Sequence, residues 1–299
     1  MAPSDPATEH AGTTSLSLWY LPEEPALART RSARPRRYLM CPPAHFAVGY
    51  SINPWMDPDK PVDAPLALAQ WEQLREVYRS LGHAVEVLVP QPGLPDMVFT
   101  ADGSLVVDGR VFGARFAHAQ REPEAEAHLR WYAENGFAHL HVPVHINEGE
   151  GDFTVTASWV LAGRGFRTNP LAHGEAQEFL GRPVVGLELV DPRFYHLGLA
   201  LAVLDDAADE VAYYPGAFSP GSREVLRRLF PDALVATGED AAAFGLNAVS
   251  DGLHVVLPQA AAGLCDALRE RGFTTVGVDL SELHKGGGGV KCCSLELRD

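Results

Sequence analysis

The sequence is poor in cysteine and in positive charge, and it contains no long apolar run. Its four cysteines, at positions 41, 265, 292 and 293, lack the spacing of a zinc site. They do not suggest a disulfide framework either, because adjacent cysteines rarely bridge each other. Lysine and arginine number 24 against 39 acidic residues, which gives a formal net charge of -15. We therefore expect no nucleic acid and no anionic membrane as a partner, whereas a cationic small molecule would be attracted.

No stretch is long and apolar enough to span a bilayer, and the N-terminus does not resemble a secretory signal. We therefore expect a cytoplasmic protein with free thiols. Residues 1–36 combine Pro, Ala, Ser and Thr with several arginines, a composition that predicts a flexible N-terminal arm. The remaining chain, 37–299, is predicted to form a single catalytic domain.

From residue 37 onward, one order of elements recurs at a roughly constant spacing: two strands, a helix and a strand. Apolar residues three and four apart predict the helices 65–81, 123–136, 170–180, 220–229 and 259–272. Asp108-Gly109 is typical of the type I′ turn of a hairpin. The recurrence predicts an α/β fold built as a closed array of modules. A doubly wound sheet is the alternative, and it would require longer helices between single strands.

Near the C-terminus, two adjacent cysteines follow a run of four glycines, Gly286–Gly289. Glycine lets a ligand approach the main chain closely, so this run indicates a loop that crosses a site. We interpret the segment after it as a strand, on which Cys292 and Cys293 would face opposite sides. One thiol could then face a cleft while the other packs. The alternative is that both are small buried hydrophobic residues.

Other residues suited to catalysis stand at the starts of the earlier modules: Asp102, Glu148 or Glu150, and His196. In a closed array these starts converge, so the side chains would meet Cys292. A thiol, an imidazole and carboxylates are the groups needed for nucleophilic catalysis with acid and base assistance. The thiol needs a positive neighbour to become a thiolate, and His196, Lys291 or a bound cation could supply one.

Four strings in this chain resemble, in order, the motifs of the guanidine-modifying superfamily: Met97-Val98-Phe99-Thr100-Ala101-Asp102, Glu148-Gly149-Glu150-Gly151-Asp152, Tyr195-His196-Leu197 and Gly286-Gly287-Gly288-Gly289-Val290-Lys291-Cys292-Cys293-Ser294. Its members are arginine deiminases, dimethylarginine dimethylaminohydrolases, arginine dihydrolases and amidinotransferases. The resemblance implies a five-bladed α/β propeller of ββαβ modules with pseudo-fivefold symmetry. The loop 52–56 looks most like the bacterial arginine-dihydrolase and dimethylargininase-like branch.

The resemblance also implies roles for individual residues. Cys292 would be the nucleophile, and His196 the general acid and base. Either Glu148 or Glu150 would support the histidine, because the motif here has one residue more than usual; Glu148 is preferred. The substrate-binding residues would be Asp102, which grips the guanidinium, Asp152, the α-carboxylate ligands Arg121 and Arg167, and Asn53 in a mobile loop. No metal and no cofactor would be required.

The predicted function is hydrolysis at the guanidinium carbon of arginine or an N-substituted arginine, through a covalent thiouronium on Cys292. The expected partner is a small cationic guanidino amino acid. Whether the protein forms a homodimer is left open. Gly198 stands where deiminases and dihydrolases have an aspartate, which favours a substituted guanidine. One alternative is an amidinotransferase that passes the amidino group to an amine. A second is a catalytically silent propeller that binds a small molecule.

Overall fold

The computed structural model describes Met1 and residues 30–299. Within the compact unit Arg31–Asp299, the strands form five sheets of three. The strands are β1 (Arg37–Met40), β2 (Ala84–Val87), β3 (Ser104–Val107), β4 (Arg110–Gly113), β5 (His139–His141), β6 (Phe153–Val155), β7 (Val160–Arg164), β8 (Val184–Glu188), β9 (Leu201–Asp205), β10 (Glu210–Tyr213), β11 (Leu234–Val235), β12 (Val249–Ser250), β13 (His254–Pro258), β14 (Thr274–Val278) and β15 (Leu295–Glu296).

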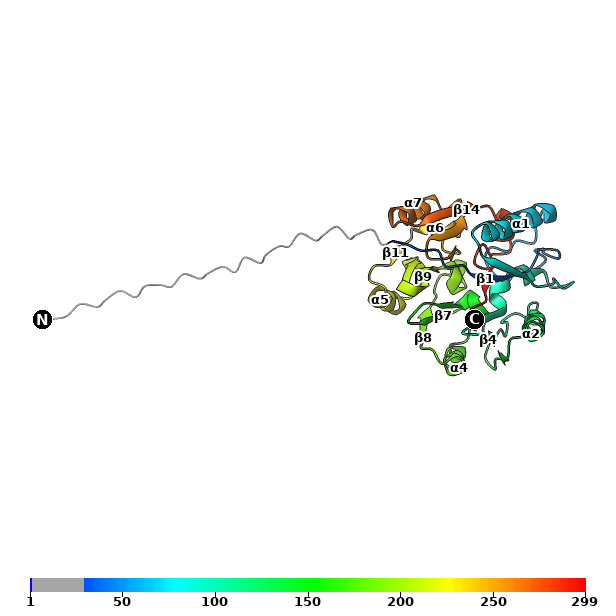
Figure 1. Cartoon of the computed structure of the whole chain (residues 1–299), viewed down its shortest axis with the longest axis horizontal. Coiled ribbons are helices and arrows are strands. Elements are labelled where there is room, and N and C mark those ends of the chain that lie inside the picture. The colour runs from blue at the N-terminus through cyan, green and yellow to red at the C-terminus, as the bar shows by residue number, and fades with distance from the viewer. Residues whose placement is uncertain (2–29) are drawn as a thin grey trace. The chain divides into compact units, whose positions relative to one another are not determined.

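Every sheet has the same internal order, an antiparallel pair followed by a parallel strand. A helix connects the second strand to the third in each, and Figure 1 shows these helices at the periphery of the unit. They are α1 (Ala64–Ser80), α2 (Glu124–Glu134), α4 (Pro170–Leu180), α5 (Pro220–Leu229) and α7 (Ala262–Glu270). The predicted ββαβ modules are therefore confirmed, and the single doubly wound sheet is wrong.

One of the five sheets is assembled from both ends of the domain. Strand β15 pairs antiparallel with β1, with Tyr38 opposite Glu296 and Leu39 opposite Leu295. Strand β2 then joins β1 on its other side in parallel. The chain segment that precedes β15 is consequently tied to the first residues of the domain.

Local sequence signals account for the element boundaries. Asp108 and Gly109 both have positive φ, as the type I′ turn between β3 and β4 requires. The Asn169 side chain accepts a hydrogen bond from Leu171 N–H and caps α4, which begins at Pro170 and ends before the left-handed Gly181. Helix α1 buries the side chains at its helical spacing, including Trp71, Leu74 and Tyr78.

Short helices lie between the modules: η1 (Pro95–Val98), η2 (Thr100–Gly103), α3 (Gly149–Asp152), η3 (Pro192–Phe194), η4 (Leu197–Leu199), α6 (Gly238–Ala242) and α8 (Ser281–His284). Two more, η5 (Asp206–Ala208) and η6 (Pro215–Ala217), lie within the module of β9, β10 and β11. Among the described residues, no helix has the length and apolar content needed to cross a membrane.

The prediction that Cys292 lies on the last strand is wrong. The segment 290–293 is a turn, and β15 begins only at Leu295. Cys293 N–H donates to Gly289 O at 3.1 Å and Ser294 N–H donates to Lys291 O at 2.9 Å, so the chain coils here instead of extending. The argument that the two thiols occupy opposite faces of a strand does not hold.

Part of the predicted N-terminal arm belongs to the compact unit. Of residues 1–36, the segment 2–29 lies outside the described residues, whereas Arg31, Arg34 and Arg36 contact the domain. Arg31 pairs with Glu210 at 2.9 Å, and its guanidinium carbon lies 3.3 Å from the ring centroid of Phe273. The described domain therefore begins at Arg31, because these arginines bind acidic residues of the body.

Asp206 holds two of these arginines together. Its carboxylate accepts two hydrogen bonds from Arg36, at 2.7 and 2.9 Å, and one from Arg34 at 2.6 Å. Burial would raise the pKa of Asp206, but Arg36 and Arg34 hold it well below its ordinary range.

We expect Asp206→Asn to lower the free energy of unfolding at pH 7 by about 1 to 2 kcal/mol, since charged hydrogen bonds are lost at a partly exposed site. A depressed carboxylate pKa stabilises the fold above the ordinary pKa and loses its effect as the pH falls. The deficit should therefore shrink below about pH 4. Urea unfolding at pH 7 and below pH 4 measures the difference in the free energy of unfolding between variant and wild type. Asp232→Asn, at an exposed position, is the control, and equal deficits in the two variants would contradict the prediction.

Candidate active site

The candidate catalytic residues lie on short segments that precede the first strand of their modules. Asp102 is in η2 before β3, Glu148 precedes α3 and β6, and His196 precedes η4 and β9. Helix α3 packs against both η2 and η4, which brings the three segments together. Residues that are far apart in sequence thus meet because each module starts at the same place.

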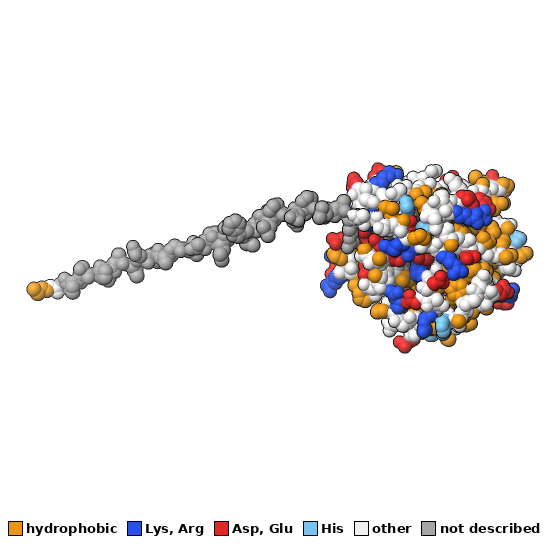
Figure 2. Space-filling view, viewed as in Figure 1, with side chains coloured by type: hydrophobic (Ala, Val, Ile, Leu, Met, Phe, Trp, Pro, Cys, Tyr) orange, Lys and Arg blue, Asp and Glu red, His pale blue; other side chains and the backbone are white. Residues whose placement is uncertain are grey.

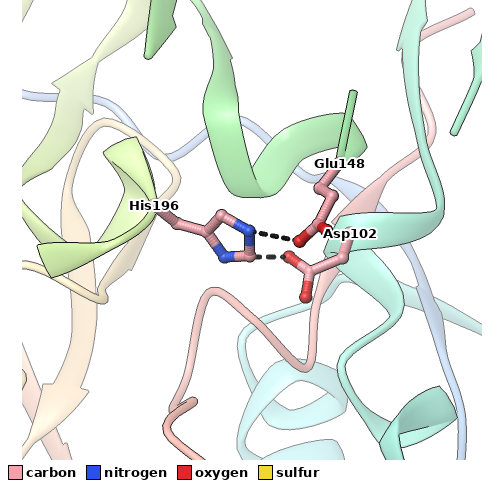
Figure 3. Close-up of side chains that lie close together, drawn as sticks. All are labelled: Asp102, Glu148 and His196. Atoms are coloured by element: carbon pink, nitrogen blue, oxygen red, sulfur yellow. Dashed lines mark hydrogen bonds and ion pairs between the residues drawn. The ribbon is translucent and has the colours of Figure 1, made fainter. Parts of the chain in front are cut away.

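His196 lies between two carboxylates (Figure 3). Its Nε2 is 2.7 Å from Glu148 Oε2, and its Nδ1 is 3.6 Å from Asp102 Oδ1. All three side chains are buried. A Cβ at Gly151 would lie 2.3 Å from Asp102 Oδ1 and 3.1 Å from His196 Nδ1, so only glycine leaves room for this approach.

The two carboxylates favour a protonated imidazole. Burial alone would lower the pKa of His196, but Asp102, Asp152 and Glu148 outweigh it and raise the pKa above its ordinary value. Burial would raise the pKa of Glu148, but Arg167 and His196 hold it well below its usual range. The raised pKa of His196 favours an imidazolium beside the Glu148 carboxylate, and an imidazolium can act as a general acid.

The two predicted α-carboxylate ligands bind the site's own carboxylates. Arg167 Nη1 donates to Glu148 Oε2 at 2.7 Å, and Arg121 Nη1 donates to Asp102 Oδ2 at 2.6 Å. Arg121 is also held by Glu124 through two hydrogen bonds, at 2.8 and 3.0 Å. Both arginines are buried beside His196 and its carboxylates, and their partners here are protein carboxylates.

The buried site has more acidic than cationic side chains. Its acidic side chains are Asp96, Asp102, Glu124, Glu148 and Asp152, and its cationic groups are Arg121, Arg167 and a protonated His196. Burial, together with this crowding, raises the pKa of Asp152 to about 6 and that of Glu124 to about 7. A bound cation would relieve the excess.

Asp102, Glu148 and His196 also have the spacing of a metal-binding group among the described residues. Arg121 and Arg167 are bonded to the same two carboxylates. A divalent ion bound there would lie beside both guanidinium groups, whose positive charge would oppose it.

Cys292 is joined to this cluster through its backbone. Its carbonyl accepts a hydrogen bond from Ala101 N–H at 3.0 Å, next to Asp102. Its Sγ lies 3.2 Å from Asn247 Nδ2, and its N–H donates to Asn247 Oδ1 at 3.2 Å. Asn247 Nδ2 also donates to Gly198 O at 2.9 Å, two residues from His196. Asn247 therefore ties Cys292 to the histidine segment.

Sequence reasoning did not select Asn247. The available signal was its place at the start of the fourth module, where the other modules carry Asp102, Glu148 and His196. Its amide both donates to the sulfur and accepts from the Cys292 backbone, so it can orient the thiol and hydrogen-bond a thiolate.

The Cys292 thiol is neutral in the described state. Burial and the nearby Asp102 carboxylate raise its pKa to about 12, in spite of Asn247 and Lys291. Cys293 is fully buried in the main hydrophobic cluster. A thiolate at Cys292 thus requires additional positive charge in the site.

The loop 51–57 covers the glycine run. Asn53 Nδ2 donates to Gly286 O at 3.1 Å and lies 3.3 Å from Tyr195 Oη. The Ile52 carbonyl accepts from Arg167 Nη2 at 2.8 Å. Trp55 Nε1 donates to Arg193 O at 2.8 Å. Asn53 is thus in direct contact with the glycine loop.

Glu150 faces away from His196. It is bonded to Lys291 and Arg298, and its Oε2 accepts from Glu296 N–H at 3.0 Å. Glu150 and Lys291 line a cavity of about 40 Å³ below the site. The contacts therefore distinguish the two candidate glutamates: Glu148 binds the histidine, and Glu150 belongs to an ion cluster.

Asp152 and Gly198 lie behind the reacting groups. Asp152 accepts from Leu197 N–H at 3.1 Å and from Thr168 Oγ1 at 2.7 Å, so it fixes the segment that follows the histidine. A Cβ at Gly198 would contact Gly151 O at 3.5 Å and Lys291 Cγ at 3.7 Å. The side chain of an aspartate at position 198 would thus start from a Cβ that contacts Lys291.

Comparison with known proteins gives a relative that covers most of both chains. The chain is 55% identical over 267 residues to the N(G),N(G)-dimethylarginine dimethylaminohydrolase of Mycobacterium tuberculosis, covering 89% of this chain and 87% of that protein. The chain belongs to the dimethylarginine dimethylaminohydrolase family. No family model matches it.

Other members of the superfamily are more distant. The chain is 35% identical over 269 residues to the bifunctional arginine dihydrolase/ornithine cyclodeaminase ArgZ of Synechocystis sp., of which it covers 38%. The substrate-bound N-terminal domain of ArgZ superimposes with a TM-score of 0.83 at 33% identity, covering 88% of this chain and 98% of that domain. A dimethylarginine dimethylaminohydrolase adduct with a TM-score of 0.72 and 19% identity, covering 88% of this chain and all of that one, supports the fold alone.

The electrostatics of the thiol can be tested with Asp102→Asn. Removing the carboxylate lowers the pKa of Cys292, so at pH 7 to 9 more thiolate is present. Alkylation by neutral iodoacetamide should accelerate about tenfold, corresponding to one pKa unit. Alkylation by cationic chloroacetamidine should slow at least about tenfold, because that reagent loses its carboxylate partner. Mass spectrometry of the Cys292 peptide measures both rates.

The control for this experiment is Asp108→Asn, on the hairpin turn between β3 and β4. It should leave both rates unchanged. If the two reagents respond to Asp102→Asn in the same direction, the proposed effect of the carboxylate on the thiol is wrong.

Proposed function

We propose that the protein hydrolyses the guanidinium carbon–nitrogen bond of an N-methylated arginine and releases citrulline and a methylated amine. The observation that carries the proposal is the buried acidic site, in which Asp102 and Glu148 flank His196 beside Cys292. Its excess of negative charge fits a cationic guanidinium. The 55% identity to a dimethylarginine dimethylaminohydrolase supports the methylated substrate.

The first half of the reaction forms a covalent thiouronium. The substrate cation binds against Asp102 and supplies the positive charge that stabilises a Cys292 thiolate. The sulfur bonds to the guanidinium carbon, and the bond from this carbon to the methylated nitrogen breaks. His196 gives its proton to the departing amine, and Glu148 holds the imidazole for this transfer. A solved ArgZ domain carries a covalently bound reaction intermediate, which supports this route.

Water completes the reaction. His196, now neutral, takes a proton from water while the oxygen bonds to the thiouronium carbon. The carbon–sulfur bond then breaks and the remaining hydroxyl proton leaves to solvent, which restores the Cys292 thiolate and leaves the carbonyl of citrulline. In an amidinotransferase, an amine would take the place of water and the same residues would act.

The substrate's α-carboxylate would bind Arg121 and Arg167. Both arginines now neutralise Asp102 and Glu148, and the substrate guanidinium can replace them on these carboxylates. Each arginine would then turn part of its guanidinium toward the substrate carboxylate. Asn53 and its loop would close over the bound molecule.

The fold supports this assembly if the five sheets close into a five-bladed propeller. The repeated sheet order and the β15–β1 pairing support such closure with pseudo-fivefold symmetry. The site would then lie on the axis, where the starts of the modules meet.

Unsubstituted arginine is the second candidate substrate, favoured by the 35% identity to arginine dihydrolases. These bifunctional relatives are longer, and the chain spans 38% of their length. Gly198 supports the methylated substrate by analogy with methylarginine hydrolases. A side chain at this position would contact Lys291, so its effect on substrate preference would be indirect.

Mass spectrometry of the products separates the candidates. With asymmetric dimethylarginine we expect citrulline and dimethylamine, at a kcat/KM at least about 100-fold above that for arginine. Cys292→Ser should abolish turnover because it removes the nucleophile. Cys293→Ser, which changes a core thiol, should keep most of the activity. A higher kcat/KM for arginine would favour the dihydrolase reading, and transfer to added glycine would favour an amidinotransferase.

A further inference from the structure

Tyr195 contacts four parts of the site without being one of its reacting groups. Its ring centroid lies 4.6 Å from the Arg167 guanidinium carbon and 4.7 Å from the His196 ring centroid. Its hydroxyl donates to Gly287 O at 2.8 Å and accepts from Asn53 Nδ2 at 3.3 Å. Tyr195 is buried. The hydroxyl therefore joins two loops that are distant in sequence.

The glycine loop depends on its main-chain hydrogen bonds, because it has no side chains of its own to anchor it. Gly286 N–H donates to Leu283 O and Gly287 N–H donates to His284 O, each at 2.9 Å, and these bonds fix its start. Two carbonyls on the site side are bound by side chains, Gly286 O by Asn53 and Gly287 O by Tyr195.

The close approach of Asn53 also depends on the glycine. Gly287 has φ +89°, and a Cβ at this position would lie 2.6 Å from Asn53 Oδ1. Any residue other than glycine would push Asn53 and its loop outward. The loop 51–57 and the glycine loop are thus in direct contact at one place, and Tyr195 Oη bonds to both sides of that contact.

We propose that the Tyr195 hydroxyl is a latch that couples the seating of the loop 51–57 to the seating of the glycine loop that leads to Cys292. When Asn53 is in place, Tyr195 Oη has both a donor and an acceptor partner. When the loop 51–57 lifts, Asn53 leaves Gly286 and Tyr195 together, and the glycine loop retains only one of its two side-chain anchors. Tyr195 is a positioning residue in this scheme.

The test is Tyr195→Phe, which keeps the ring against Arg167 and His196 and removes only the hydroxyl. Hydrogen exchange should rise at least about fivefold in both the 51–57 and the 284–290 peptides. The unfolding midpoint should stay near that of the wild type. Alkylation of Cys292 by chloroacetamidine should slow about tenfold, since closure no longer orders the nucleophile loop.

Two further variants make the result specific. Tyr214→Phe removes a hydroxyl near Gly216 and Gly238, outside both loops, and should change neither exchange nor alkylation. Asn53→Ala combined with Tyr195→Phe should be little worse than either single change, because residues that act through one contact are not additive.

The latch would be overturned by exchange that rises in one loop only, by exchange that is unchanged in both, or by additive effects of the two substitutions. The role of Tyr195 in turnover rests on the proposed function, but hydrogen exchange and alkylation of Cys292 can be measured without substrate. A wild-type protein without hydrolase activity would therefore defeat the proposed function and leave the latch to be judged on exchange.

Discussion

The excess of buried negative charge is the constraint on which the site depends. Carboxylates are costly to bury unless they are paired, and this site buries more of them than its arginines and histidine neutralise. Arg121 and Arg167 offset part of the cost by bonding to Asp102 and Glu148. Burial and the Asp102 carboxylate raise the pKa of Cys292, whereas the carboxylates raise the pKa of His196 against the effect of burial. The acidic side chains thus disfavour a thiolate at Cys292 and favour the binding of a cation.

The modular fold explains how so many charges come to one place. Each module begins with a short irregular segment before its first strand, and α3 packs against the segments of two neighbours. Such segments can direct polar side chains inward while the strands behind them bury apolar ones. Burial of apolar side chains in three hydrophobic clusters offsets the cost of the polar centre, and the main cluster reaches the site, because it includes Cys292 and Tyr195.

The sequence was informative where local chemistry decides the conformation. Asn169, Pro170 and Gly181 bound α4, and Asp108-Gly109 sets a turn, so these elements could be predicted. It was misleading at Cys292, where alternating residues suggested a strand but backbone hydrogen bonds coil the chain. The contacts of Asn247 and Tyr195 depend on which loops meet in space, and no spacing within one segment encodes that. The docking of Arg31 likewise depends on the distant Glu210.

Helix α3 shows how catalysis and stability share one turn of backbone. Glu148 points to His196, and two residues later Glu150 binds Lys291 and Arg298 on the other side. Lys291 precedes Cys292, and Arg298 follows β15, whose pairing with β1 completes the fifth sheet. The ion cluster therefore fixes the cysteine turn relative to the segment that holds the histidine. Because Glu148 and Glu150 are joined by a single glycine, a shift of the C-terminal strand would move the carboxylate that supports His196 as well as Cys292.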